Sequence, residues 1–448
     1  MWVLRGSGMK SVPSIIVVMA VVASASGDDW PQWMGPNRDA VWAETGIVDK
    51  FPEGGPKVVW RKEIGSGYSG PAVTGGRVYV MDYVTKDNFK RDNFARMRLD
   101  GDERVVCLDA EKGDILWKHS YPRKYTISYP CGPRCTPTVS EGKVYALGAE
   151  GNLWCLNASD GKVVWSKDFV KDYKAKTPIW GFTSHPLVDG KKLICVVGGP
   201  SAEVVAFDKD DGKELWKSLS SKEQGYSPPT MIEAGGVRQL LIWHAESLNG
   251  IDPETGKPYW SVPLAPRQAM GIMAPRKDGE YLYAGAVFGT AVALKLDSSK
   301  PAVTEAWRGV ENMKGKGLYP MNMTPFVENG VMYGVDQPGQ LRAVKIETGE
   351  QLWQSWKPVT GKEESKPVFC GTAFVVKNGD RFFIFNELGE LIIAKMDPKS
   401  FQEIGRAKLL EPTGVAFGRS VVWSHPAFAE KHCFVRNDKE IICVSLAK

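Results

Sequence analysis

One segment recurs along the chain at a nearly constant spacing, and this repeat limits the folds that the sequence can adopt. Each copy begins at a small residue, turns at a glycine and ends on a tryptophan. The clear copies are CLDAEKGDILW (107–117), CLNASDGKVVW (155–165), AFDKDDGKELW (206–216), GIDPETGKPYW (250–260) and AVKIETGEQLW (343–353). With a degenerate copy that ends at Trp307, successive tryptophans are 44 to 51 residues apart. Repeats of this length indicate a solenoid, a propeller or a similar array.

A second element precedes each tryptophan segment and consists of two short strands around a glycine-bearing turn. Examples are GPAVTGGRVYVM (70–81) and TPFVENGVMYGV (324–335). Four short strands in about 45 residues are typical of one blade of a β-propeller. The last unit carries Ile404 in place of the tryptophan. The pattern predicts seven complete blades, at 68–121, 132–169, 181–220, 226–264, 268–310, 318–358 and 368–412.

The two ends of the repeat region together supply an eighth blade. Residues 423–448 contain three strands but stop before the fourth, whereas 57–64 resembles an isolated outer strand with a tryptophan at the repeat position. Joining them closes the ring without free sheet edges, which β proteins avoid. We therefore predict an all-β, eight-bladed β-propeller of four-stranded antiparallel blades over 57–448. We expect the repeat tryptophans to be structural and to pack across their own turns: Trp60, Trp117, Trp165, Trp216, Trp260, Trp307 and Trp353.

The N-terminal residues have the pattern of a secretory signal. Arg5 and Lys10 precede an apolar run at 15–22, and Ala23-Ser24-Ala25 follows it as a cleavage site. The run is shorter than the roughly 20 residues that a membrane-spanning helix needs. We expect a signal peptide at 1–27, a leader at 28–56 and a periplasmic or secreted protein without a transmembrane segment.

Charge and cysteine usage narrow the classes of partner. Lys and Arg number 57 against 52 Asp and Glu, and the two signs are interleaved, so no basic block predicts nucleic-acid binding. Most of the eight cysteines lie in apolar strand-like runs, where a free thiol behaves as a small hydrophobic group. Cys131 and Cys135 lie in a loop-like stretch, where they could form a short disulfide or remain two free thiols. The five histidines lack the spacing of a metal site, so none is predicted.

With these repeats the chain resembles the pyrroloquinoline quinone (PQQ)-like repeat propellers of the quinoprotein alcohol dehydrogenase-like superfamily. Their repeat, A-x-D-x-x-T-G-x-x-x-W, stands nearly intact at Gly250–Trp260, and 29–46 is similar to the segment that precedes the propeller in secreted members. The chain is also similar to the propeller lipoprotein of the outer-membrane barrel-assembly machinery, although it lacks the lipid-modified cysteine. The resemblance implies the fold, whereas members differ in activity and include both dehydrogenases and scaffold proteins.

For a dehydrogenase, the resemblance implies PQQ and calcium in the funnel of the propeller. The features that the resemblance implies for a dehydrogenase are missing from this sequence. It has no adjacent cysteine pair and no C-x-x-C-H haem attachment, and no set of calcium ligands is recognised in it. No cofactor is therefore predicted. A quinoprotein-type dehydrogenase that oxidises an alcohol or sugar with PQQ and calcium stays as the alternative function.

The connections from the outer strand of one blade to the inner strand of the next differ in sequence, as expected of a functional face. An insertion in blade 1, at 85–103, extends the same face and could be a partner-binding lobe or a solvated excursion. Aromatic rings and arginines could hold a planar or anionic ligand there, or simply pack the loops together. We predict a monomeric, non-catalytic binding or scaffold module that takes a protein or small-molecule ligand through Tyr68, Arg134, Trp180, His185, Tyr226, Arg267, Tyr319, Asn322, Arg419, Trp423 and His425.

Overall fold

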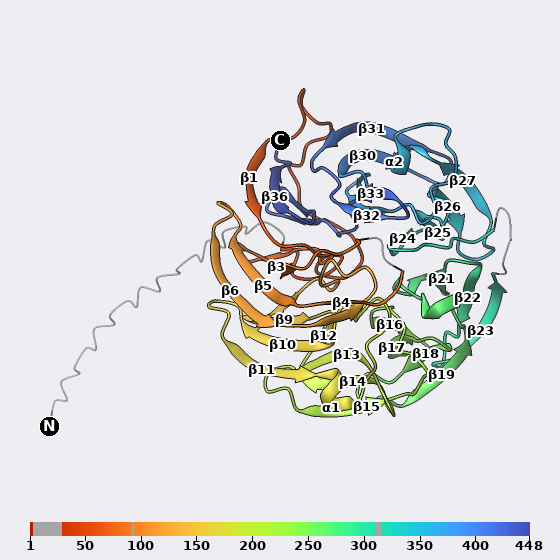
Figure 1. Cartoon of the computed structure of the whole chain (residues 1–448). Helices are drawn as coiled ribbons and strands as arrows, with labels where there is room; N and C mark the ends of the chain where they lie inside the picture. The colour runs from red at the N-terminus through yellow and green to blue at the C-terminus, as the bar shows by residue number, and fades with distance from the viewer. Residues whose placement is uncertain (3–28, 92–93, 310–315) are drawn as a thin grey trace.

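A computed structural model describes residues 1–2, 29–91, 94–309 and 316–448 of the chain. The predicted signal peptide falls on residues that are, apart from the first two, outside the described part. Eight four-stranded antiparallel sheets follow one another around a common centre in the order of the sequence (Figure 1). The predicted all-β, eight-bladed propeller is therefore confirmed. No helix in the described ranges has the length and apolarity to cross a bilayer.

In every blade the strands are arranged from the centre of the ring outward. The innermost strands are mostly the shortest, because the space near the centre is smallest. Blades 1 and 2 consist of β2 (Ala72–Thr74), β3 (Arg77–Thr85), β5 (Gly101–Asp109) and β6 (Ile115–Pro122), then β8 (Thr138–Ser140), β9 (Lys143–Leu147), β10 (Asn152–Asn157) and β11 (Val163–Asp168). Blades 3 and 4 consist of β12 (Leu187–Asp189), β13 (Lys192–Gly199), β14 (Ala202–Asp208) and β15 (Glu214–Ser218), then β16 (Thr230–Ala234), β17 (Val237–Trp243), β18 (Ser247–Ile251) and β19 (Pro258–Pro263).

The second half of the ring repeats this arrangement. Blades 5 and 6 consist of β20 (Arg276–Asp278), β21 (Tyr281–Ala286), β22 (Thr290–Leu296) and β23 (Val303–Arg308), then β24 (Phe326–Glu328), β25 (Val331–Val335), β26 (Leu341–Lys345) and β27 (Gln351–Ser355). Blades 7 and 8 consist of β28 (Ala373–Asn378), β29 (Arg381–Asn386), β30 (Glu390–Met396) and β31 (Phe401–Lys408), then β34 (Ala427–Ala429), β35 (His432–Arg436), β36 (Glu440–Ser445) and β1 (Val58–Glu63).

The ring is closed by the strand nearest the N-terminus. β1 pairs antiparallel with β36, so that Trp60 lies opposite Cys443. Figure 1 shows the red β1 beside the blue β36, although the two are almost 400 residues apart in the chain. This pairing confirms the predicted closure, and it leaves neither the first nor the last strand as an open edge.

Short elements lie in the connections between these strands. The pairing of β3 with β5 extends to Thr85 and Gly101, so their connection comprises residues 86–100, fewer than the 85–103 expected. Within it, β4 pairs with the strand that follows blade 1. These additional elements are β4 (Met97–Leu99), β7 (Tyr125–Ile127), β32 (Gly414–Ala416), β33 (Arg419–Val421), α1 (Phe169–Tyr173), α2 (Lys357–Thr360) and a 3-10 turn (Arg267–Ala269).

Each repeat tryptophan lies directly opposite the small first residue of its own repeat, as predicted. The cross-strand pairs include Cys107 with Trp117, Ala206 with Trp216 and Gly250 with Trp260. At Gly250 a Cβ atom would come within 2.2 Å of the Trp260 ring, so this position of blade 4 requires glycine.

The same tryptophans also reach the next blade, which the sequence interpretation missed. The Trp165 indole N–H donates to the carbonyl of Lys209 in blade 3 at 3.1 Å, and a Cβ atom on Gly212 of that turn would lie 2.7 Å from the ring. Trp260 differs and donates to Gln239 of its own blade at 2.7 Å. The other indole N–H groups donate to the next blade as follows: Trp60 to Ala110, Trp117 to Ala158, Trp216 to Pro253, Trp307 to Ile346 and Trp353 to Asp397.

Blade 7 lacks this tryptophan, and the strand register corrects which residue replaces it. Ile393 of β30 lies opposite Gly405, just before the bulge, which is the tryptophan position of the other blades. The equivalent residue is therefore Gly405 and not Ile404. The ring of Phe51, from the leader, lies 3.6 Å from where a Cβ atom of Gly405 would be, and Phe51 is buried.

The leader covers the face opposite the outer-to-inner connections. Asp29 accepts from the N–H of Gly75 in a turn between an inner strand and its neighbour, and such turns lie on that opposite face. The backbone N–H of Trp42 donates to the carbonyl of Lys377 at the end of β28, and the backbone N–H of Lys377 donates to the carbonyl of Ala40. Trp30, Trp33 and Trp42 are 1–4% exposed. The leader is thus part of the folded core and closes this end of the ring's centre.

The bond between blades makes a direct stability prediction. Trp165→Ala should lower the free energy of unfolding by about 3–5 kcal/mol, because it removes a large buried ring and leaves a cavity. Trp165→Phe keeps an aromatic ring but loses the hydrogen bond to Lys209. We therefore expect a smaller loss in the free energy of unfolding, of about 1 kcal/mol for the bond and a further amount for the smaller ring. Urea unfolding followed by circular dichroism measures both. Val164→Ala, at an exposed position of the same strand, is the matched control. An equal effect of Trp165→Ala and Val164→Ala would contradict the prediction.

Candidate functional site

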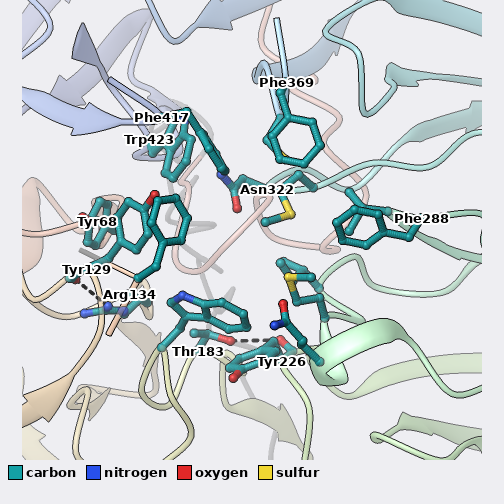
Figure 2. Close-up of a pocket in the computed structure, with 18 of the residues that line it drawn as sticks. Tyr68, Tyr129, Arg134, Thr183, Tyr226, Phe288, Asn322, Phe369, Phe417 and Trp423 are labelled. Carbon is teal, nitrogen blue, oxygen red and sulfur yellow. Dashed lines mark hydrogen bonds between the residues drawn. The ribbon is translucent and has the colours of Figure 1, made fainter. Parts of the chain in front are cut away.

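The centre of the outer-to-inner connection face contains a cavity of about 270 Å³. In Figure 2 side chains from blades all around the ring surround it. Most of the predicted site residues come together there. The predicted residues that line the cavity are Tyr68, Arg134, Trp180, His185, Tyr226, Asn322, Trp423 and His425.

Three predicted residues are not in the lining. Arg267 lies over the Phe288 ring, with its guanidinium carbon 4.7 Å from the ring centre, and Arg419 is placed similarly over Phe417 at 5.6 Å. Arg419 also pairs with the buried Glu387 at 2.7 Å. Tyr319 is buried, and its N–H donates to Asp336. The two arginines therefore support rings of the lining, and Tyr319 has a structural position.

The structure adds a group of aromatic side chains that the sequence interpretation did not select. Phe94 comes from the blade 1 insertion, and its ring contacts Tyr129 and Phe417, with ring centres 5.3 and 5.4 Å apart. Phe288 comes from the turn between β21 and β22, and Phe369 precedes blade 7. Inspection of the turns between second and third strands would have found Phe288, because they share the face of the outer-to-inner connections.

Arg134 is the single Lys, Arg, Asp or Glu among the described residues that line the cavity. Its guanidinium donates to the carbonyls of Ser128 and Tyr129, at 3.0 and 2.7 Å, and to that of Gly132. It also lies over the Tyr68 ring at 5.1 Å. These contacts hold the positive charge in one position at the wall, where it favours an anionic or electron-rich ligand group.

Two histidines separate the cavity from the leader. The ring of Trp33 in the leader stacks on His185, with ring centres 4.8 Å apart, and its edge contacts His425 at 5.9 Å. His185 Nδ1 accepts from the N–H of Thr136 at 3.0 Å. Both histidines line the cavity, and Trp33 of the leader, which is not in the lining, packs against them.

Burial keeps both imidazoles neutral. It lowers the pKa of His425 to about 3. The pKa of His185 is also lowered well below its ordinary value, mainly by burial and further by His425 and Arg38. Removing a charged imidazolium from water is costly, so the neutral form is favoured. The floor of the cavity is thus polar but uncharged at neutral pH.

The lining does not suit the calcium ion of a quinoprotein dehydrogenase. Calcium takes six to eight oxygen ligands, usually with carboxylates among them. The described lining residues supply amide and hydroxyl oxygens, from Asn322, Gln268, Thr183 and the tyrosines, but no carboxylate. Across the described ranges, no group of three or more His, Cys, Asp or Glu side chains stands close enough to hold a metal ion.

Cys131 and Cys135 are free thiols in this structure. The Arg91 guanidinium lies 3.5 Å from the Cys131 sulfur. The Cys135 thiol instead points toward the Phe182 carbonyl, 3.9 Å away, within the apolar core of blades 2 and 3. The loop between the two residues places their sulfur atoms in separate environments, and the structure contains no disulfide between them.

Fold and site together define a class, the eight-bladed propellers of PQQ-like repeats. Within this class the chain matches the family of outer membrane protein assembly factor BamB over residues 101–236 and 244–448, and it belongs to that family. It is 26% identical over 233 residues to the outer membrane protein assembly factor BamB of Shewanella oneidensis. That match covers 49% of this chain and 56% of the relative, so the chain spans about half the length of the curated relative.

Solved structures agree on the fold. BamB from Moraxella catarrhalis superposes with a TM-score of 0.55 at 15% identity, over 87% of this chain and 97% of that one. A quinohemoprotein alcohol dehydrogenase from Comamonas testosteroni gives a TM-score of 0.59 at 13% identity, over 94% of this chain and 80% of the enzyme. At these identities the likeness shows a shared architecture and leaves function to the site.

The lowered pKa values of His185 and His425 predict a loss of stability in acid. An unfolded histidine has a pKa of about 6.5, so the unfolded chain binds protons first as the pH falls below that value. Stability is then lost from about pH 6.5 down toward the lower folded-state pKa values, by at most about 2 kcal/mol for each histidine at pH 5. Melting temperatures should therefore fall between about pH 7.5 and about pH 5. A His185→Gln/His425→Gln variant should show a smaller fall over this range, and a fall equal to that of the wild type would contradict the assignment.

Proposed function

We propose that the protein is a non-catalytic binding or scaffold module that holds a protein or small-molecule ligand in the funnel cavity. The observation that supports this most is the composition of the lining, which combines many aromatic rings with one fixed cation and two neutral imidazoles. Concave sites with mostly apolar walls and a few placed polar groups are the usual form of ligand sites.

The same lining argues against acid–base chemistry. A general base or acid works best when its pKa lies near the operating pH. His425, with a pKa of about 3, is too weak a base for this role, and the lowered pKa of His185 has the same effect. No carboxylate of the described lining could replace them. These points favour binding over the alternative, a dehydrogenase of an alcohol or sugar that uses PQQ and calcium.

The proposed location is the periplasm or the extracellular space, which rests on the expected signal peptide at 1–27. The family supports a scaffold role, since its relatives carry the name of an outer membrane protein assembly factor. A propeller suits such a role because its rigid ring presents loops from eight blades on one face. We further propose that the chain acts as a monomeric ring.

A fluorescent dye tests whether the cavity binds ligands. The probe 1-anilinonaphthalene-8-sulfonate carries aromatic rings and one anionic group, which match the aromatic wall and Arg134. We expect saturable fluorescence enhancement with the native protein. Met321→Trp places a larger side chain in the cavity and should weaken dye binding about tenfold or more. Leu116→Trp, at an exposed position of the outer strand β6, is the matched control and should bind like the wild type. Equal dye affinity in Met321→Trp and wild type would contradict the cavity as the site.

A redox assay tests the alternative. The purified protein is incubated with PQQ and calcium and then supplied with primary alcohols or aldoses and an artificial electron-accepting dye. Because the lining lacks calcium ligands of the carboxylate type, we expect no dye reduction above that of PQQ and calcium alone. Substrate-dependent dye reduction that the Met321→Trp variant abolishes would replace the binding proposal with the dehydrogenase.

A further inference from the structure

A second hollow adjoins the aromatic cavity and has the opposite character. Its volume is about 580 Å³, and it shares the side chains of Trp180 and Gln268 with the cavity. It continues outward between blades 2, 3 and 4, past residues 198–200, where β13 ends and the turn to β14 begins. We call this second hollow the basic groove, because of the charges described next.

Among the described residues, four cations and one carboxylate line the basic groove. The cations are Arg96, Lys174, Lys176 and Lys222, all exposed, and the carboxylate is that of Glu223. The ammonium groups of Lys174 and Lys176 have no ion-pair partner among the described residues. Lys222 pairs with Glu246 at 3.7 Å, so the positive charge of the groove rests mainly on Arg96, Lys174 and Lys176.

The lining of the groove is partly fixed by hydrogen bonds. The Arg96 guanidinium donates to the carbonyls of Thr126 and Thr177 at 2.9 and 2.7 Å, which holds it at the edge of the groove. The Glu223 carboxylate accepts from the Tyr226 hydroxyl at 3.4 Å. Tyr226 also lies edge-on to Trp180, with ring centres 5.6 Å apart. The junction between cavity and groove is therefore built from side chains that contact one another.

The blade 1 insertion contributes to both hollows. Phe94 joins the aromatic wall of the cavity, and Arg96, two residues later, joins the basic groove. The pairing of β4 with β7 anchors the segment directly after them. This placement favours the hypothesis that the insertion is a partner-binding lobe over the hypothesis that it is a solvated excursion.

We propose that the cavity and the basic groove together bind an extended acidic segment of a partner protein, which inserts one aromatic side chain into the cavity. The proposal rests on the proposed binding function and names the kind of partner. An aromatic anchor in a buried pocket supplies most of the affinity in such contacts. The acidic residues beside it would lie along the groove, where complementary charge supports association and orientation.

A nucleic-acid strand would also bring negative charge and aromatic rings, but the structure favours the peptide. Glu223 stands within the groove and would repel closely spaced phosphates, whereas a peptide can place a neutral or basic residue opposite it. Single-strand binding proteins instead line the whole path with cations and stacking rings.

The test uses the full-length protein and a fluorescein-labelled peptide of about 12 residues, made of Asp, Glu, Ser and Gly around one central Trp. Fluorescence anisotropy reports its affinity. We expect saturable binding that weakens with added salt. Replacing the central Trp by Ala, or the acidic residues by Lys, should each weaken binding about tenfold or more. Tighter binding of an oligothymidylate of similar length than of the peptide would overturn the proposal in favour of a nucleic-acid strand.

Protein variants locate the binding. Lys174→Glu/Lys176→Glu should weaken the peptide affinity about tenfold or more and reduce its salt dependence. Lys112→Glu/Lys257→Glu makes the same charge change in repeat turns on the opposite face and should leave the affinity unchanged. Equal affinity in the Lys174→Glu/Lys176→Glu variant and the wild type would overturn the proposal. If the native protein binds the naphthalene dye but not the peptide, the acidic partner is wrong and the ligand cavity stands. If it binds neither, both proposals fail.

Discussion

The indole that reaches from one blade to the next is the contact on which the ring depends. A propeller has no single core, since each blade packs only on its two neighbours, and the interfaces between blades must carry the stability. At most junctions a tryptophan of one blade donates to a turn carbonyl of the next and covers the glycine of that turn, as Trp165 does with Lys209 and Gly212. Each copy of the sequence repeat thus supplies the same kind of interface between neighbouring blades.

The exceptions show how the chain replaces that contact. At the junction after blade 4 the acceptor is Gln239 of the same blade, and the degenerate blade 5 segment has no glycine in its turn. In blade 7 the equivalent position is Gly405, and Phe51 of the leader packs there instead. The leader also bonds to blade 8, where the Val48 N–H donates to Leu446. A segment outside the repeats therefore supports the ring near its closing junction.

The leader connects stability with the site. Trp33 packs against His185 and His425, so the element that covers one face also supports two residues of the cavity on the other. Burial beneath this cover keeps the two imidazoles uncharged. The aromatic wall, the neutral floor and the adjoining positive groove then divide one face into an apolar part and a charged part. This division underlies the proposed choice of ligand.

Local pattern by itself determined the blades, their number, the closing strand and eight of the residues that line the cavity, because strand alternation and turn glycines are short-range signals that repeat. Tertiary structure alone decided the rest. Trp165 meets its acceptor 44 residues away, Trp33 of the leader contacts His185 and His425, and Phe94 reaches the cavity from an insertion without repeat character. The thiols of Cys131 and Cys135 were likewise separated by the path of their loop. Such contacts join segments that no periodicity relates, and they exist only once the ring has closed and brought those segments together.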